Sequence, residues 1–339
     1  MRIEEQVLLA PFSTFHVGGK ATYFVRVKSV PELLEALRWA KKHKIRFFIL
    51  GGGSNILIGD NGFDGLVIKI ELLGTSFTDR GEWIEAAVAS GESWDAFVAQ
   101  GVSRGLYGIE NLSGIPGTVG GTPVQNVAAY GAEVAGTILF VDAIDTHTLQ
   151  NIRLNNEKCF FSYRNSFFKT LEGSHVVITQ VIFRLEKKAP LRLTYREVGD
   201  FFKTRNVVEP TLSEVRRAIL EIRSKKFPDL SVMGTAGSFF KNPSLSHKDL
   251  AQLLVTFPSL PYFPLEKGGG KIALGWLLEE LGWKGAREER AGVFERHALV
   301  LVNFGGASAA DINGLAHRIT VDVAQKTGIA IEPEIISVS

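Results

Sequence analysis

The chain has 339 residues, of which 45% are hydrophobic and 22% charged, a composition that excludes general disorder. At about 150 residues per domain, the length predicts two or three domains. The 38 basic and 36 acidic residues leave a net charge of +2, so we expect no nucleic-acid partner. The single cysteine, Cys159, excludes internal disulfides and metal–thiolate clusters. The seven histidines show no close pair at ligand spacing, so we expect no metal.

No apolar run approaches the roughly 18 residues of a membrane span. The first six residues, Met1 to Gln6, lack the charged-then-apolar pattern of a signal peptide. We therefore expect a cytoplasmic protein without a membrane partner, and a monomer rather than an oligomer.

The first part of the chain predicts a β–α–β unit. Ser29 is placed to cap a helix that continues through Leu33 and Leu37 to a lysine-rich end near Lys44. Apolar and β-branched runs predict strands on both sides of this helix, at residues 22–28, 46–50 and 65–71.

The middle of the chain is richer in strands. One helix, about 94–104, is capped by Ser93, and a long glycine-rich loop covers 108–134. Residues 187–211 are polar and predict a linker or excursion. Alternating patterns predict strands at 83–89, 138–145, 151–154 and 175–186.

From about residue 212 the pattern changes to helices separated by short strands. The expected helices contain Val215 to Ile222, Ile272 to Leu281, and a segment capped by Ser308 and closed by Gly328. Strands are expected at 297–303 and 329–338. The whole pattern predicts an α+β architecture.

Five segments carry candidate chemistry. The first, Gly51-Gly52-Gly53-Ser54-Asn55, follows a strand, and successive glycine N–H groups suit a phosphate or diphosphate. An ordinary tight turn explains this segment equally well on its own. The chain contains neither a Gly-x-Gly-x-x-Gly dinucleotide fingerprint here nor a P-loop.

The second segment, 114–121, continues to Gln125-Asn126 and Gly131. Its length, its glycines and its few charges suggest close backbone contact with a planar polar ligand. The third is Tyr163-Arg164-Asn165-Ser166, where a guanidinium among phenylalanines needs a fixed anionic partner. An internal carboxylate would also satisfy it.

The last two segments are weaker when each is taken alone. Ala236-Gly237-Ser238-Phe239-Phe240-Lys241-Asn242-Pro243 places one hydroxyl among small and aromatic residues, without the pattern of a serine nucleophile. Glu332-Pro333-Glu334 offers a carboxylate near the end of the chain, and a simple exposed charge explains it as well.

Taken together and in this order, the five segments resemble the UDP-N-acetylenolpyruvoylglucosamine reductase (UDP-N-acetylmuramate dehydrogenase) family. The resemblance extends from Phe12 to Glu334. The polar excursion at 187–211 is similar to the extra loop of the first type in this family. Asn165 stands where the family usually has aspartate.

The resemblance implies an α+β fold with a two-subdomain FAD-binding unit of the vanillyl-alcohol-oxidase (PCMH) type and a smaller substrate-binding domain. The implied subdomains are 1–71 and 72–211, with the PCMH-type region at about 14–187. The substrate domain would be 212–339, and its last strand would bring Glu334 back to the active site.

The resemblance also implies a flavoenzyme of peptidoglycan precursor synthesis, and so a role in cell shape and division. NADPH would reduce non-covalent FAD. Flavin N5 would then pass a hydride to the enolpyruvyl methylene carbon of a UDP-sugar, giving UDP-N-acetylmuramate. Ser238 matches the proton donor, and Arg164 and Glu334 match residues around the substrate carboxylate.

Further family positions match substrate and cofactor contacts. UDP-sugar contacts are implied at Tyr195, Lys226 and Asn242. FAD contacts are implied in two groups, namely Gly51, Gly52, Gly53, Ser54, Asn55, Ile56 and Leu57, and Ile115, Pro116, Gly117, Val119, Gly120, Gly121, Gln125, Asn126 and Gly131.

Two other functions are also compatible with the sequence. The first is an FAD-linked oxidase of an alcohol or sugar lactone with the same fold. Such enzymes often tether flavin through a histidine, and no histidine lies within 45–80. The second is a non-catalytic nucleotide-binding module, which would leave Ser238 and Glu334 without a role.

Overall fold

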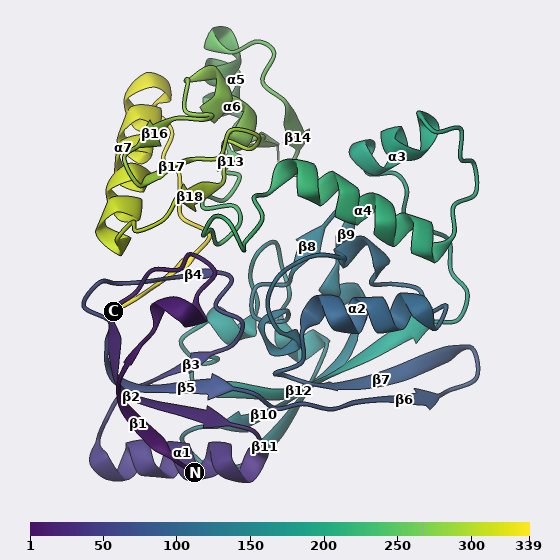
Figure 1. Ribbon diagram of the computed structural model, residues 1–339. Helices are drawn as coiled ribbons and strands as arrows, with labels where there is room; N and C mark the ends of the chain where they lie inside the picture. The colour runs from purple at the N-terminus through teal and green to yellow at the C-terminus, as the bar shows by residue number, and fades with distance from the viewer. Residues whose placement is uncertain (267) are drawn as a thin grey trace. The chain divides into compact units, whose positions relative to one another are not determined.

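The computed structural model describes residues 1–266 and 268–339, and the chain divides into two compact units (Figure 1). The first unit comprises Met1–Val7, Ala21–Gly52 and Asp64–Arg223. The second comprises Leu8–Lys20, Gly53–Phe63 and Ser224–Ser339. The division into 1–71, 72–211 and 212–339 stays a prediction.

The first sheet of the first unit has the strand order β1-β2-β5-β3, and helix α1 (Val30–His43) packs against it (Figure 1). Ser29 caps α1 as predicted, because its Oγ accepts a hydrogen bond from the Glu32 amide at 3.3 Å. Leu33 and Leu37 are buried against the sheet. The strands are β1 (Ile3–Leu8), β2 (Lys20–Val27), β3 (Phe47–Leu50) and β5 (Phe63–Ile70).

The second sheet of this unit is antiparallel and has the order β11-β10-β12-β7-β6. Helix α2 (Trp94–Ser103), capped by Ser93, buries Trp94 and Phe97 against Phe183 of the sheet. The strands are β6 (Thr75–Asp79), β7 (Trp83–Ala89), β10 (Ile138–Asp145), β11 (Asn151–Asn155) and β12 (Val176–Glu186).

The glycine-rich loop 108–134 is ordered by short 3-10 turns at Glu110–Leu112, Val119–Gly121 and Val134–Gly136. A small hairpin of β8 (Ala128–Ala129) and β9 (Ala132–Glu133) lies before the last of these turns. The predicted linker 187–211 contains a helix that the sequence did not predict, α3 (Arg196–Lys203). It is followed by α4 (Leu212–Lys226).

In the second unit, helices and short sheets surround a large hydrophobic core. Its helices are α5 (His247–Thr256), α6 (Leu274–Glu280) and α7 (Ala309–Thr327). Strand β19 (Ile336–Val338) pairs in parallel with β4 (Ile56–Ile58), which joins the end of the chain to an early segment. The remaining strands are β13 (Ser244–Leu245), β14 (Tyr262–Pro264), β15 (Gly270–Ile272), β16 (Arg287–Glu288), β17 (Ala291–Val293) and β18 (Leu301–Asn303).

Helix α7 is confirmed with both of its predicted ends. Ser308 and Asp311 form a capping box, and Gly328 ends the helix at a φ of 70°. The helix expected to begin at Ile272 begins at Leu274, because Ile272 is the last residue of β15. Among residues 1–266 and 268–339, no helix combines the length and apolar character needed to cross a membrane.

A pair of charged residues joins α4 to α2 inside the first unit. Arg216 donates to both oxygens of Asp95, at 2.6 and 2.8 Å, and Asp95 also accepts from the Gly114 amide at 2.5 Å. Burial alone would raise the pKa of Asp95, but the bonds from Arg216 and Gly114 outweigh it, so the pKa is lowered. The ionised carboxylate therefore stabilises the folded state.

We expect the free energy of unfolding to depend less on pH under acidic conditions in Asp95→Asn than in the unchanged protein. A carboxyl whose pKa is lower when folded contributes stability above its unfolded pKa of about 3.9, and loses it as the pH falls through the folded pKa. Urea unfolding midpoints between about pH 2 and 6 measure this slope. The exposed Glu157→Gln serves as control, and equal slopes in all three proteins would contradict the prediction.

Candidate functional site

The two glycine segments predicted to hold the cofactor meet each other in the first unit. A Cβ placed on Gly52 would lie 2.5 Å from Gly117 Cα and 3.0 Å from its carbonyl carbon. A Cβ on Gly51 would lie 2.9 Å from the hydroxyl oxygen of Thr118. The backbone of the second loop therefore excludes a side chain at position 52, whereas position 51 faces the side chain of Thr118.

The first loop presents backbone donors. Within the described part of the chain, the N–H groups of Gly51, Gly52 and Gly53 donate to no backbone carbonyl. Lys69 of β5 donates to the Gly51 carbonyl, and burial lowers the pKa of this lysine. Successive N–H groups without side chains above them form an anion-binding concavity. The arrangement therefore fits the diphosphate of a dinucleotide such as FAD.

Other predicted cofactor residues lie in the core or take part in local bonding. Ile56 and Leu57 are buried in β4 of the second unit, where they pair with β19. Asn126 is buried, and its side chain bonds to Glu133, to the Ser162 carbonyl and to the Ala135 amide. This side chain thus links the glycine loop to the turn that carries Arg164.

Arg164 lies in a tight turn of the first unit, in which Ser162 and Asn165 exchange backbone hydrogen bonds of 3.0 and 3.1 Å. The φ of Arg164 is 52°, a left-handed conformation that is uncommon for a residue with a side chain. Its Nη1 donates to the Ala128 carbonyl at 3.1 Å. Such strain costs roughly 1–3 kcal/mol and clusters at functional positions.

Tyr195 is the N-cap residue before α3 in the first unit and is 40% exposed. Its ring meets that of the buried Tyr130 edge to face, with centroids 5.4 Å apart. Gly131 is adjacent, because a Cβ there would lie 3.8 Å from the Tyr195 Cβ. Burial raises the pKa of Tyr195, so the exposed part of the ring carries a neutral hydroxyl at pH 7.

Ser238 and Glu334 lie on neighbouring segments of the second unit. Phe239, next to Ser238, accepts a hydrogen bond of 2.7 Å from the Glu334 amide, and Phe240 bridges to Pro333. Glu334 is buried, and Ser238 is half-buried and bridges to Val300. The last segment therefore pairs through its backbone with the segment that carries Ser238. A shared site for the Ser238 and Glu334 side chains stays a prediction. That Arg164 meets them stays a prediction.

Asn242 and Lys226 also belong to the second unit. Asn242 Oδ1 accepts from the Leu274 amide at 3.0 Å and so stabilises the first turn of α6. Lys226 ends α4, next to Phe227. Phe227 stacks on His297 with ring centroids 5.5 Å apart. No role for His297 was predicted, because its neighbours are remote along the chain.

Desolvation, with a contribution from Lys226, lowers the pKa of His297 to about 4. His297 is therefore neutral when folded, whereas an unfolded histidine titrates near 6.5. Between these two pKa values, the histidine binds a proton in the unfolded chain but not in the folded one. The stability present above about pH 6.5 is therefore lost as the pH falls toward 4, by at most about 3 kcal/mol.

We expect His297→Gln to reduce the loss of stability between about pH 6.5 and 5, because glutamine does not titrate. The free energy of unfolding in urea at each pH measures the slope. His317→Gln, at an exposed position of α7, should keep the slope of the unchanged chain. An unaltered slope in His297→Gln would show that another group causes the loss.

A cavity of about 560 Å³ lies elsewhere in the first unit. It is lined by Lys28, Asp142, Arg153 and Gln180, among others, and by none of the residues predicted to bind cofactor or substrate. The glycine loops, and not this cavity, carry the successive backbone N–H groups that suit a diphosphate.

Comparison with known proteins places this geometry in a class. Residues 21–146 match the model of an FAD binding domain, and residues 229–338 match the model of the UDP-N-acetylenolpyruvoylglucosamine reductase C-terminal domain. The class is thus an α+β chain that carries an FAD-binding-type domain, as the sequence predicted.

Near-full-length relatives identify the family. UDP-N-acetylenolpyruvoylglucosamine reductases from Pseudomonas fluorescens Pf-5 and Chromobacterium violaceum are 39% and 38% identical to this chain, and each alignment covers 98% of both chains. The chain belongs to the UDP-N-acetylenolpyruvoylglucosamine reductase family. The crystal structure of the Thermus caldophilus reductase shares its fold, with a TM-score of 0.71, 24% identity and full coverage of both chains.

Proposed function

We propose that this chain is an FAD-dependent UDP-N-acetylenolpyruvoylglucosamine reductase. It uses NADPH to convert the enolpyruvyl ether of a UDP-sugar to a lactyl ether, giving UDP-N-acetylmuramate for the cell wall. The observation that carries the proposal is the 39% identity to a relative of that name over 98% of both chains. A monomeric state and a cytoplasmic location belong to the same proposal.

When bound, FAD supplies the hydride chemistry that no side chain can provide. The chain's own residues bind the substrate and move the proton. In our proposal Arg164 faces the substrate carboxylate, where its fixed positive charge stabilises negative charge that develops during reduction. The left-handed turn at Arg164 supports this role, because strained backbone conformations cluster at functional positions.

Ser238 donates a proton to the carbon next to the substrate carboxylate, in the same proposal. Its pairing with the Glu334 segment supports a shared site in the second unit. Glu334 assists only when protonated or hydrogen-bonded, since a bare carboxylate would repel the developing charge. Tyr195, Lys226 and Asn242 bind the UDP-sugar.

The test starts with the colour of the purified protein. We expect a yellow protein whose FAD is released on denaturation, and anaerobic stopped-flow should show flavin reduction by NADPH followed by reoxidation by the UDP-sugar. NADH serves as the comparison. A folded, colourless preparation that takes up no FAD would overturn the proposal. Rapid reoxidation by oxygen without the UDP-sugar would favour the oxidase alternative.

A further inference from the structure

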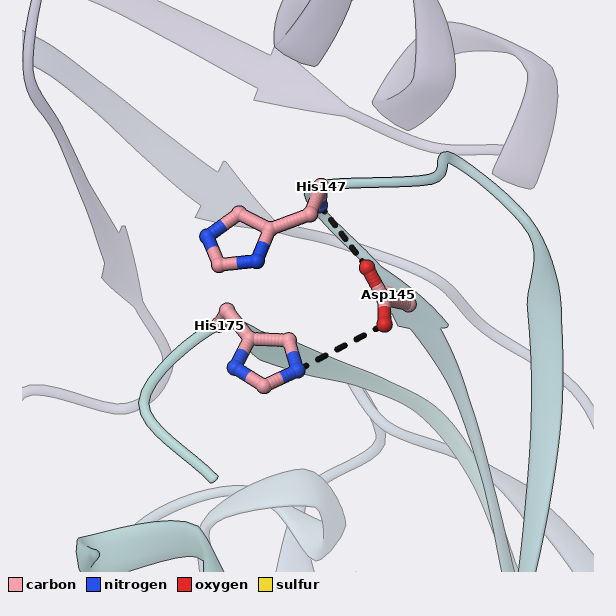
Figure 2. Close-up of side chains that lie close together, drawn as sticks. All are labelled: Asp145, His147 and His175. Carbon is pink, nitrogen blue, oxygen red and sulfur yellow. Dashed lines mark hydrogen bonds and ion pairs between the residues drawn. The ribbon is translucent and has the colours of Figure 1, made fainter. Parts of the chain in front are cut away.

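Asp145, His147 and His175 gather at one corner of the antiparallel sheet in the first unit (Figure 2). Asp145 ends β10, and His175 immediately precedes β12. In Figure 2 the two imidazole rings lie one over the other, and the carboxylate lies beside them. None of the three residues belongs to the proposed reductase site.

Strand register brings these residues together. Asp145 pairs with Val176 in the β10–β12 ladder, so His175 lies beside the carboxylate, with its Nε2 3.4 Å from Asp145 Oδ2. The other oxygen, Oδ1, accepts from the amides of His147 and Thr148 at 2.8 and 2.9 Å. This turn folds His147 back, and the two rings stack with centroids 4.5 Å apart. The sequence prediction missed the pair because the two histidines are far apart along the chain.

Two imidazoles and one carboxylate form a ligand set suited to late first-row divalent cations. One potential ligand atom from each residue lies within 4.8 Å of the other two. Ligand atoms around a tetrahedral zinc lie roughly 3.3 Å apart, given bonds of about 2.0–2.1 Å. The required closure is small, and His147 is exposed, so side-chain rotation can supply it.

We propose that Asp145, His147 and His175 bind one divalent cation of the Zn²⁺ type, with water completing the coordination. The bound ion ties the turn after β10 to the start of β12. Lys41 of α1 already holds this turn, because its Nζ donates to the His147 carbonyl at 3.2 Å. Its ammonium also places a positive charge near the site, so we expect an affinity on the order of 10 µM rather than nanomolar.

The test is calorimetric titration of the 339-residue protein, as purified, with ZnCl₂. We expect one equivalent to bind at the site, and affinity to fall at least about tenfold in each of His147→Gln, His175→Gln and Asp145→Asn. Asp145→Asn is the most informative change, because an amide oxygen can still accept from the His147 and Thr148 amides. His317→Gln, at an exposed histidine of the second unit, should bind zinc as the unchanged protein does.

Thermal unfolding gives a second readout, because an ion that binds only the folded state raises the melting temperature. The rise should appear with His317→Gln and disappear with the three ligand variants. Zinc binding that persists in the variants would place the ion elsewhere, for example on the diphosphate of the cofactor. Absence of binding up to about 1 mM would leave only the contact between His175 and Asp145 and the stacked rings. Either result overturns the proposal, and neither bears on the reductase activity.

Discussion

Alanine at Ser238 is expected to leave flavin reduction by NADPH intact and to slow the reduction of the UDP-sugar by about 10²- to 10⁴-fold, the usual contribution of general acid catalysis. The reason is chemical, because only the second half-reaction needs a proton at carbon. Anaerobic stopped-flow measures the two half-reactions separately. The flavin absorbance falls as NADPH reduces the flavin, and it recovers as the UDP-sugar reoxidises it.

The neighbourhood of Ser238 makes this substitution mild for the fold. The flanking Phe239 and Phe240 are buried, and Phe239 is bonded to the backbones of Leu299 and Glu334. These contacts hold the backbone in place whichever small side chain occupies position 238. Ser238→Cys, which keeps a proton donor, should recover part of the second half-reaction. Ser244→Ala, at an exposed serine of β13, should leave both half-reactions unchanged.

Equal slowing of both half-reactions in Ser238→Ala would contradict an acid role. It would indicate a change in cofactor binding or in the position of the whole segment. The ratio of the two rates is therefore the decisive quantity.

Elements with strong local signals were predicted from the sequence. Helices α1 and α7 have a serine cap and a regular apolar face, and both ends of α7 were predicted. Strand β10, Ile138–Asp145, has its predicted bounds. In each case the local preference agrees with the packing, so no tertiary information was needed.

Elements without such signals were missed. Helix α3 is short, contains Gly199 and has no side-chain cap, so its sequence resembles a linker. The predicted strand 297–303 is reduced to Leu301–Asn303, and several strands of the second unit have only two or three residues. Runs this short carry no measurable alternation, and only tertiary pairing defines them.

The candidate site likewise depends on tertiary contacts that the sequence does not reveal. The sequence marked both glycine loops, but their contact through Gly52 and Gly117 depends on the fold. Lys69 and His297 had no motif around them, because their partners come from other segments. The Asp145 cluster is likewise created by strand register. Motifs predict chemistry carried by adjacent residues, whereas groups assembled from distant segments need coordinates.

The other large effect is expected from a substitution at Gly52, where the two glycine loops are in contact. Alanine there would place its Cβ 2.5 Å from Gly117 Cα and 3.2 Å from the Thr118 amide nitrogen. Both are backbone atoms. The second loop is held by hydrogen bonds from Trp94 to the Gly117 carbonyl and from Val119 to the Glu92 carbonyl. Relief of the clash therefore requires the loops to separate, at a cost of about 1–3 kcal/mol.

If these loops hold FAD, Gly52→Ala should weaken FAD binding about 10- to 100-fold, since each 1.4 kcal/mol is a factor of ten. The flavin-to-protein absorbance ratio after dialysis, followed by titration with FAD, measures the loss. Gly136→Ala is a matched control, because the nearest atom to its Cβ is the tip of Arg192 at 3.9 Å. This control should retain FAD. If Gly52→Ala also keeps its FAD at the original affinity, the two loops do not form the cofactor site, because no rearrangement that admits the extra methyl leaves their contact unchanged.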